Sequence, residues 1–251
     1  KPLAGEVDQQ TRAFSLSKTE GDHTLYTIKA EQVTTFKDTQ KNLLHGVVVD
    51  IFGKAGGEQS GKRHDRITTP ECEYDPAMQT LWVPGEVEMS FGLPTAAATQ
   101  NADEAPQRVV VRTSQLHFDQ STGVATTDAA VRFTFPQGEG SSRGARYDPQ
   151  QQTLRLNSNV EFRLKDADAP QAAPTVIHAG EMLYLREESR IALDGTVEIE
   201  KQARRLRSRA ASVWLNDQNQ AQRAELTGDV RAEQRPVASG AAATAASAHS
   251  Q

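Results

Sequence analysis

The sequence has little cysteine, no long apolar run and no excess of positive charge. Its 251 residues include one cysteine, Cys72, which excludes a framework of intramolecular disulfides and a cysteine-rich zinc site. No stretch approaches the roughly 18 consecutive apolar residues that a membrane-spanning helix needs. The formal net charge is -5, whereas nucleic-acid-binding domains and polybasic membrane-surface proteins carry basic stripes. We therefore expect neither a nucleic-acid partner nor a polybasic contact with a membrane.

The two ends of the sequence carry no structural pattern. The chain opens at Lys1 and Pro2, without an initiating methionine or a signal-peptide pattern, and we expect a mature or trimmed chain. Residues 236–251 are rich in Ala, Ser and Thr, and we expect a disordered tail or a linker there.

Apolar and polar residues alternate along most of the chain, and helical periodicity is almost absent. Val87, Met89 and Phe91, for example, alternate with Glu and Ser. Successive side chains of a strand face opposite sides, so each such run has one apolar and one polar face. This pattern is typical of antiparallel sheets with one covered face and predicts an all-β fold. Hydrophobic residues make up 37%, and we expect a core spread along an elongated two-sheet body that is not fully closed.

The same alternation defines a stripe of large apolar side chains on the inward face of the predicted strands. They are candidates to line an open hydrophobic groove, and an ordinary closed core is the alternative. The candidate groove-lining residues are Val47, Val49, Ile51, Val87, Met89, Phe91, Val131, Phe133, Phe135, Val160, Phe162, Leu164, Val197 and Ile199.

A short frame recurs four times along the chain. In each copy an aromatic residue precedes a valine by 13 positions, and a small residue lies five positions before the aromatic one. The small, aromatic and valine residues are Thr69, Tyr74 and Val87; Thr113, Phe118 and Val131; Ser142, Tyr147 and Val160; and Ala179, Tyr184 and Val197. An aspartate follows the aromatic residue in the first three copies (Asp75, Asp119 and Asp148) and favours a turn. Each copy therefore predicts one β-hairpin.

Further hairpins are predicted on either side of these copies. Residues 13–28 predict one that turns at residues 20–22, and residues 30–51 and 208–232 are degenerate copies of the frame. Atypical terminal copies are characteristic of a stacked repeat array.

Motifs for catalysis or metal binding are weak. Residues 56–62 have the spacing of a phosphate-binding loop, but Arg63 follows where Ser or Thr is required, so we expect a flexible hairpin loop. The histidines show no metal-ligand spacing, and we expect them at the surface. They are His23, His45, His64, His117, His178 and His249. We expect no enzymatic activity, no bound metal and no cofactor.

Arg205, Arg207 and Arg209 share one face of a predicted strand within the densest basic run. Two interpretations stay open. The run binds a phosphate or carboxylate of a ligand or partner, or it is a solvated strand face that is kept charged against aggregation.

The repeated pattern resembles the OstA-like repeats of lipopolysaccharide transport. The resemblance rests on Ala or Thr, four residues, an aromatic residue and Asp, then a turn and Gly-x-Val followed by alternating apolar residues. Three N-terminal segments, at residues 14–16, 25–30 and 43–47, resemble the periplasmic part of LptC. Residues 108–235 resemble LptA more closely.

The resemblance implies an antiparallel, twisted β-jelly roll with an open hydrophobic groove. Residues 1–92 form its LptC-like part, and residues 108–235 continue the same roll as LptA-like repeats. It implies a non-enzymatic periplasmic bridge that binds lipopolysaccharide in the groove and passes it from the inner-membrane exporter toward the outer membrane. The expected partners are the permease and ATPase of an ABC exporter at the N-terminal edge and another OstA-like jelly roll at the C-terminal edge, along a strand at residues 224–232. An N-terminal helix that precedes this chain is expected to tether it to the inner membrane.

Two other classes of function are compatible with the pattern. One is a structural or adhesive all-β repeat protein with a closed core and no ligand. The other is a carbohydrate-active β-solenoid enzyme, which would need acidic residues clustered on one face.

Overall fold

The computed structural model describes residues 7–37, 39, 41–52, 63–94, 108–165, 171–216 and 220–234. The predicted loop at residues 56–62 and the predicted tail at residues 236–251 lie outside this part. The described residues form seventeen β-strands and no helix, which confirms the all-β class. No helix within these ranges is therefore long and apolar enough to cross a membrane.

The strands are β1 (Val7–Glu20), β2 (His23–Phe36), β3 (Asn42–Ile51), β4 (Arg63–Asp75), β5 (Thr80–Pro94), β6 (Val109–Asp119), β7 (Ala125–Phe135), β8 (Gly138–Asp148), β9 (Thr153–Leu164), β10 (Thr175–Ala179), β11 (Glu181–Leu185), β12 (Arg190–Asp194), β13 (Val197–Lys201), β14 (Arg204–Ser208), β15 (Ala210–Leu215), β16 (Ala221–Thr227) and β17 (Arg231–Gln234).

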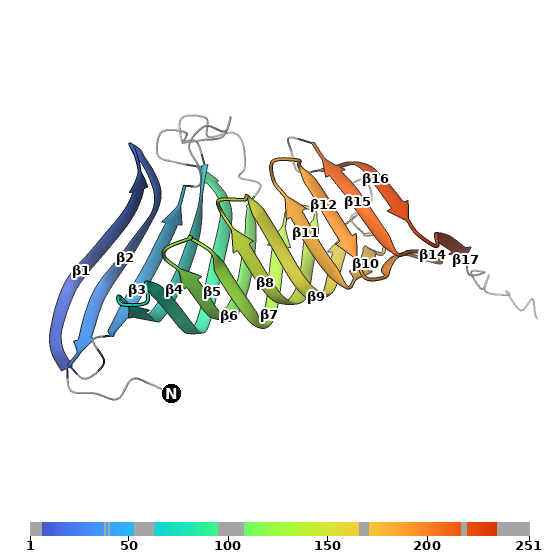
Figure 1. The fold of residues 1–251 in the computed structure, drawn as a ribbon. Coiled ribbons are helices and arrows are strands. Elements are labelled where there is room, and N and C mark those ends of the chain that lie inside the picture. The colour runs from blue at the N-terminus through green and yellow to red at the C-terminus, as the bar shows by residue number, and fades with distance from the viewer. Residues whose placement is uncertain are drawn as a thin grey trace, which may run out of the picture.

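The strands stack side by side along an elongated body, from β1 at one end to β16 and β17 at the other (Figure 1). All pairings are antiparallel, as the alternating pattern predicts. β5 pairs directly with β6, so the ladder is continuous between residues 1–92 and 108–235. The resulting open, antiparallel sheet confirms the jelly-roll architecture.

The sheet is folded into two half-sheets because its long strands bend in the middle. The pairing of β5 with β6 shifts between Val83 and Glu86, and similar shifts occur in the neighbouring pairs. At β9 the division becomes visible in the pairing. Residues 153–156 of this strand pair with β11, whereas residues 160–164 pair with β10. Beyond β9, one ladder runs through β10, β13, β14 and β17, and the other through β11, β12, β15 and β16.

We name the halves by their repeated residues. The valine half-sheet holds the β10 ladder and the strand segments with the repeated valines, and the aromatic half-sheet holds the β11 ladder and the segments with the repeated aromatic residues. The line of bends between them is the corner. Several corner residues have positive φ, a conformation that relieves the change in strand direction. They are Ala13, Gly46, Gln115, Gly144, Asn159, Gly195, Thr196, Gly228 and Asp229.

A row of alternating valines and small residues lies inside the corner of the valine half-sheet. Each valine of this row faces a small residue of the next strand. The cross-strand pairs are Val47 with Thr69, Val87 with Thr113, Val131 with Ser142, Val160 with Ala179, and Val197 with Ser208. These five valines are at most 2% exposed. The 13-residue frame of the sequence therefore encodes one buried row of the corner.

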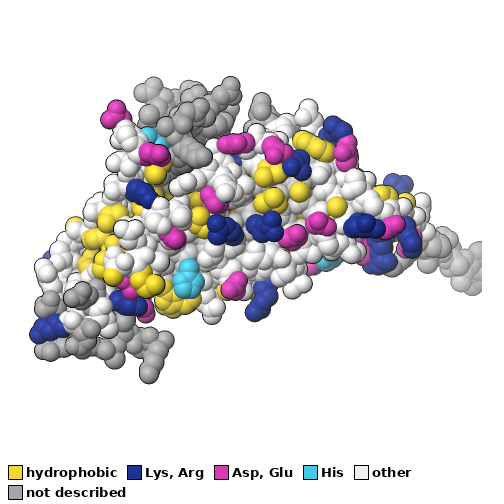
Figure 2. Space-filling model, viewed as in Figure 1, with side chains coloured by type: hydrophobic (Ala, Val, Ile, Leu, Met, Phe, Trp, Pro, Cys, Tyr) yellow, Lys and Arg dark blue, Asp and Glu magenta, His cyan; other side chains and the backbone are white. Residues whose placement is uncertain are grey.

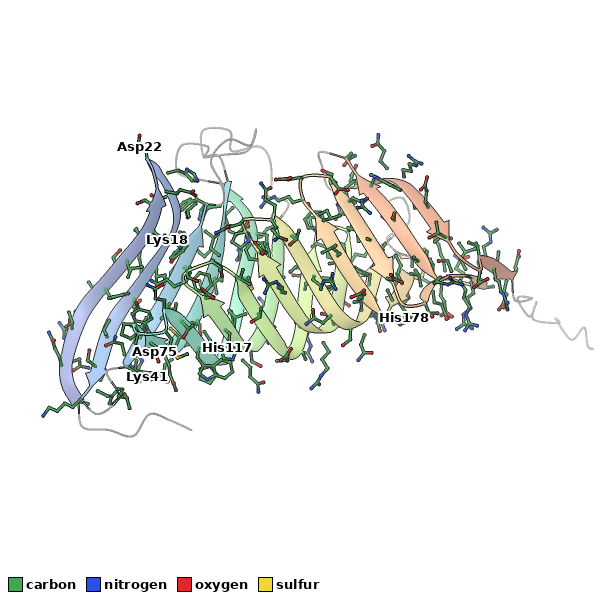
Figure 3. The ribbon with its side chains drawn as sticks, viewed as in Figure 1. Lys18, Asp22, Lys41, Asp75, His117 and His178 are labelled. Carbon is green, nitrogen blue, oxygen red and sulfur yellow. The ribbon has the colours of Figure 1, made fainter. Side chains whose placement is uncertain are left out.

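The predicted hairpins are confirmed. Asp75 Oδ1 accepts hydrogen bonds from the backbone N–H groups of Ala77 and Met78, and Asp119 and Asp148 each hold their turns in the same way. Lys41, directly before β3, lies 3.6 Å from Asp75 at the end of β4, and Figure 3 shows the two residues at the same edge of the body. The predicted strand at residues 224–232 is wrong in one respect. It is divided into β16 and β17, because the corner falls at residues 228–230.

The two half-sheets pack face to face around an apolar core. The rings of Tyr26, from the valine half-sheet, and Phe118, from the aromatic half-sheet, meet edge-on with centroids 5.6 Å apart. A small cavity remains between the half-sheets in the N-terminal part. Its lining residues are Val47, Val49, Ile67, Thr69, Cys72, Leu81, Val83, Leu116 and Phe118.

Candidate functional site

The margin opposite the corner is where both half-sheets end, and we call it the open margin. One inward row of the valine half-sheet shows how burial changes along it. The exposed fraction rises from 4% at Val49 to 6% at Met89 and 7% at Phe133. Phe162 and Ile199, the next two members of the row, are half-buried. The half-sheets therefore cover the interior less completely toward the C-terminal end.

Half-buried apolar side chains line both sides of this less covered part. They pack against the core but keep part of their surface accessible. Those from the valine half-sheet are Phe135, Phe162, Ile177 and Ile199, and those from the aromatic half-sheet are Leu154, Tyr184 and Ile191. The rings of Phe133 and Phe162 meet edge-on at 5.3 Å, and Phe135 lies 6.3 Å from Phe162. Charged side chains of both signs lie along the outer surface of the middle strands (Figure 2).

The structure divides the fourteen candidate groove-lining residues into two sets. Nine are buried core residues: Val47, Val49, Ile51, Val87, Met89, Val131, Phe133, Val160 and Val197. Five are half-buried: Phe91, Phe135, Phe162, Leu164 and Ile199. All but Leu164 belong to the core cluster or pack against it, so the predicted inward phase places them together. Their role in binding a ligand stays a prediction.

Polar contacts cross the open margin in its N-terminal part. The hydroxyl of Tyr26 donates to the carbonyl of Gln120, and the ammonium of Lys18 donates to the carbonyl of Ser121. Burial, followed by the proximity of Tyr74 and Asp119, raises the pKa of Tyr26 to about 12. Tyr26 therefore stays protonated at neutral pH and remains a donor. Lys18 belongs to β1, at the N-terminal end of the body (Figure 3).

Asp65 is a buried carboxylate on the inward face of β4, with a side chain that is 6% exposed. Its Oδ1 accepts the backbone N–H of Gly92 at 2.8 Å, and its Oδ2 accepts the Tyr147 hydroxyl at 2.5 Å. Arg186 Nη1 lies 3.4 Å from the same Oδ2. Burial, and then the Asp65 charge, raise the pKa of Tyr147 well above its ordinary value. Sequence reasoning missed this cluster, although Asp65 stands out as an acidic residue in phase with inward-facing Ile67 and Thr69.

The three arginines of the basic run are paired within the protein. Arg205 and Arg207 both contact Glu198 across the β13–β14 ladder. Arg209 lies beyond β14 and pairs with Asp229 at 2.7 Å. Such pairs are typical of a solvated strand face, the second of the two interpretations of the run.

The expectation that all histidines lie at the surface is wrong for His64. Its side chain is 9% exposed, with Nε2 3.3 Å from Asp50 Oδ1 and the ring 5.6 Å from that of Phe52. The reason is that β4 already begins at Arg63, so His64 lies in a paired strand and not in a loop. His117 and His178 are exposed (Figure 3).

Comparison with known families agrees with the fold. A family model described as LptC, lipopolysaccharide-assembly, LptC-related, matches residues 5–165. This is more than half of the chain, and the chain belongs to this family. No curated protein matches the chain significantly. The match ends directly after β9, where the two ladders separate.

Membership gives the chain a role in lipopolysaccharide transport. Proteins of this family are transport bridge components that interact with other Lpt proteins and are not known as enzymes. The family domain is periplasmic and belongs to proteins anchored in the inner membrane. The division of the chain near residues 92–108 stays a prediction, because the match runs across it.

Proposed function

We propose that this protein is a periplasmic bridge that holds the acyl chains of lipopolysaccharide between its half-sheets and passes the lipid toward the outer membrane. The observation that carries the proposal is the loss of cover along the inward row, from buried Val49 to half-buried Phe162 and Ile199. An apolar surface that faces inward but is only partly covered is suited to an elongated apolar ligand.

The size of the hydrophobic effect explains why such a surface is needed. An acyl chain of about a dozen methylenes costs roughly 10 kcal/mol to expose to water, at about 0.8 kcal/mol per methylene. Passage of the lipid through an aqueous space requires a continuous apolar cover and no reactive group. The repeated Val, Phe and Ile side chains on the inner face provide that cover along the body.

The free edges suit end-to-end assembly. β1 pairs with β2 alone, and β16 and β17 each pair on one side within the described residues. Unpaired backbone groups at a sheet edge accept a further strand from another chain. We assign the β1 edge to the ABC exporter and the β16–β17 edge to another jelly roll of the same kind.

Site-specific photo-crosslinking tests the proposal. With a photoreactive residue at Phe162 or Ile199, we expect covalent capture of lipopolysaccharide, because both side chains face the interior. The neighbouring positions Arg163 and Glu200 are matched controls on the outer face, and we expect no capture there. Equal capture at inner and outer positions, or none at all, would contradict lipid binding between the half-sheets and favour a structural all-β repeat protein.

A further inference from the structure

The Asp65 cluster connects the two half-sheets across the open margin. Asp65 and Gly92 belong to the valine half-sheet, whereas Tyr147 is the penultimate residue of β8 in the aromatic half-sheet and Arg186 directly follows β11. Tyr147 and Arg186 lie 82 and 121 positions from Asp65 in the sequence, so only the folded arrangement brings them together. The contact therefore depends on the distance between the half-sheets.

Apolar packing reinforces this connection. The ring of Tyr147 meets that of Phe91 edge-on, with centroids 5.3 Å apart. Phe91 directly precedes Gly92, whose N–H binds Asp65. One buried carboxylate and one ring pair thus fill the margin between β4, β5 and β8. A buried carboxylate is stable only while its hydrogen bonds are made, so this arrangement favours a single closed geometry.

The cluster also lies at a boundary in burial. The small cavity under β3 to β6 is on its N-terminal side, and the inward residues there, such as Val49 and Ile67, are 3–4% exposed. Beyond it, Phe135, Phe162 and Ile199 are half-buried. The covered and the less covered parts of the interior meet at Tyr147.

We propose that Asp65, Tyr147 and Arg186 form a latch between the half-sheets, and that an acyl chain passes between the N-terminal cavity and the half-covered C-terminal part only when this latch opens. The inference rests on the proposed lipid-binding function. In the resting protein the acyl chain occupies the C-terminal part, with its end against the Tyr147 and Phe91 rings. For the acyl chain to pass, Tyr147 and Arg186 must lose their contacts to Asp65, while the hydrogen bond from Gly92 to Asp65 is kept.

Methionine provides probes that hardly alter packing. The chain has three methionines. Met89 lies beneath the latch on β5 and is 6% exposed, and Met78 lies in an outer turn and is 73% exposed. With Met182 replaced by leucine, photo-methionine reports lipid at the Met89 and Met78 positions alone. A photoreactive residue at Ile199, in a separate preparation, reports loading of the C-terminal part.

We expect purified lipopolysaccharide to be captured at Ile199 and scarcely at Met89 in the otherwise unchanged protein. Tyr147→Phe keeps the ring and removes the hydroxyl, and capture at Met89 should rise roughly tenfold, the change expected when one hydrogen bond to a buried charge is lost. Tyr74→Phe is the matched control, because Tyr74 has the same place in the first copy of the frame and its hydroxyl contacts Oε1 of Gln120 at 3.3 Å, and not Asp65, in the described structure. Met78 gives the background of non-specific capture.

The outcomes separate the latch from the proposed function. Absence of capture at Ile199 in every variant overturns lipid binding itself. Capture at Ile199 with equal capture at Met89 before and after Tyr147→Phe leaves lipid binding intact and overturns the latch. If Tyr147→Phe does not fold, as judged by thermal melting, Arg186→Gln replaces it, because Arg186 is 38% exposed and its removal leaves the core intact. A Met89 signal unchanged by Arg186→Gln likewise overturns the latch.

Discussion

Cys72 lies on the inner face of the aromatic half-sheet and is fully buried. It lines the N-terminal cavity together with Leu81 and Leu116. Burial, with smaller contributions from Glu71 and Glu73, raises the pKa of the Cys72 thiol to about 12. Because the pKa is raised, the reactive thiolate is scarce at every pH well below 12.

The reactivity of Cys72 tests how tightly the N-terminal cavity is closed. At pH 8 about one thiol in ten thousand is ionised for a pKa near 12, so we expect the native protein to resist a disulfide reagent for hours. The same reagent should label the thiol within minutes after unfolding in guanidinium. Fast labelling of the native protein, followed by absorbance, would show that this part of the core opens frequently.

Residue parity was predictable from the sequence, but exposure was not. Alternation alone places Val49, Met89 and Phe162 on one inward row, because the period of a strand is fixed. Their different exposure depends on the separation of the half-sheets, which no local pattern encodes. The partners of Asp65 could not be predicted from the sequence for the same reason, since Tyr147 and Arg186 belong to other copies of the repeat.

Among the strands, β8 contains Gly140, which leaves space for the side chain of Phe133 on the neighbouring strand. A Cβ atom on Gly140 would lie 2.3 Å from the Phe133 ring and 2.5 Å from the Glu161 carbonyl oxygen. Gly140 pairs with Phe133 on one side and with Phe162 on the other. The absence of a side chain thus makes room for the aromatic rings of the inner face.

Substitution of Gly140 should therefore loosen the aromatic part of β7 to β9. We expect Gly140→Ala to lower the free energy of unfolding by about 1–3 kcal/mol, the usual cost of overpacking a filled core. Gly85→Ala is the control, because its Cβ would meet nothing within 4 Å, and we expect a change of under about 1 kcal/mol. Chemical denaturation measures both. Equal effects of the two changes would mean that the Phe133 ring moves aside without cost.

The frame predicted that hairpins form, but the bends that divide each strand were not foreseen everywhere. Corner residues such as Gln115, Thr196 and Asp229 have positive φ despite carrying side chains. A residue with a side chain rarely adopts positive φ, so residue type alone did not indicate these bends. Residues 224–232 were accordingly predicted as one strand and form two.

The direction of the backbone N–H groups at the C-terminal edge of the molecule follows from the hydrogen bonds of β15. The N–H of Leu215 donates to the carbonyl of Ser189 at 2.7 Å, on the side of β12. N–H directions alternate along a strand, so Ser212 points its N–H toward β16, where it is opposite Glu225. Glu225 therefore points its N–H toward β15, and the N–H of Ala224 points toward the free edge. The valine row also ends here, at Val230, which is 53% exposed.

Proline substitutions on β16 separate assembly from folding. Ala224→Pro removes an outward donor, so we expect an unchanged melting temperature and weaker capture of a jelly-roll partner in a pull-down. Glu225→Pro removes an inward donor, and we expect a lower melting temperature. Unimpaired partner capture by Ala224→Pro would show that another surface forms the joint.

The buried row of valines and small residues determines the steps by which the length of the body can change between variants. Each copy of the frame contributes two strand segments to each half-sheet, and neighbouring strands lie about 4.8 Å apart, so one copy adds roughly 10 Å. Duplication or deletion of a whole copy keeps valine opposite a small residue. Gain or loss of half a copy places valine against valine at the corner, where both are buried. Natural variants of this chain should therefore differ in length by whole copies, each with its own hairpin.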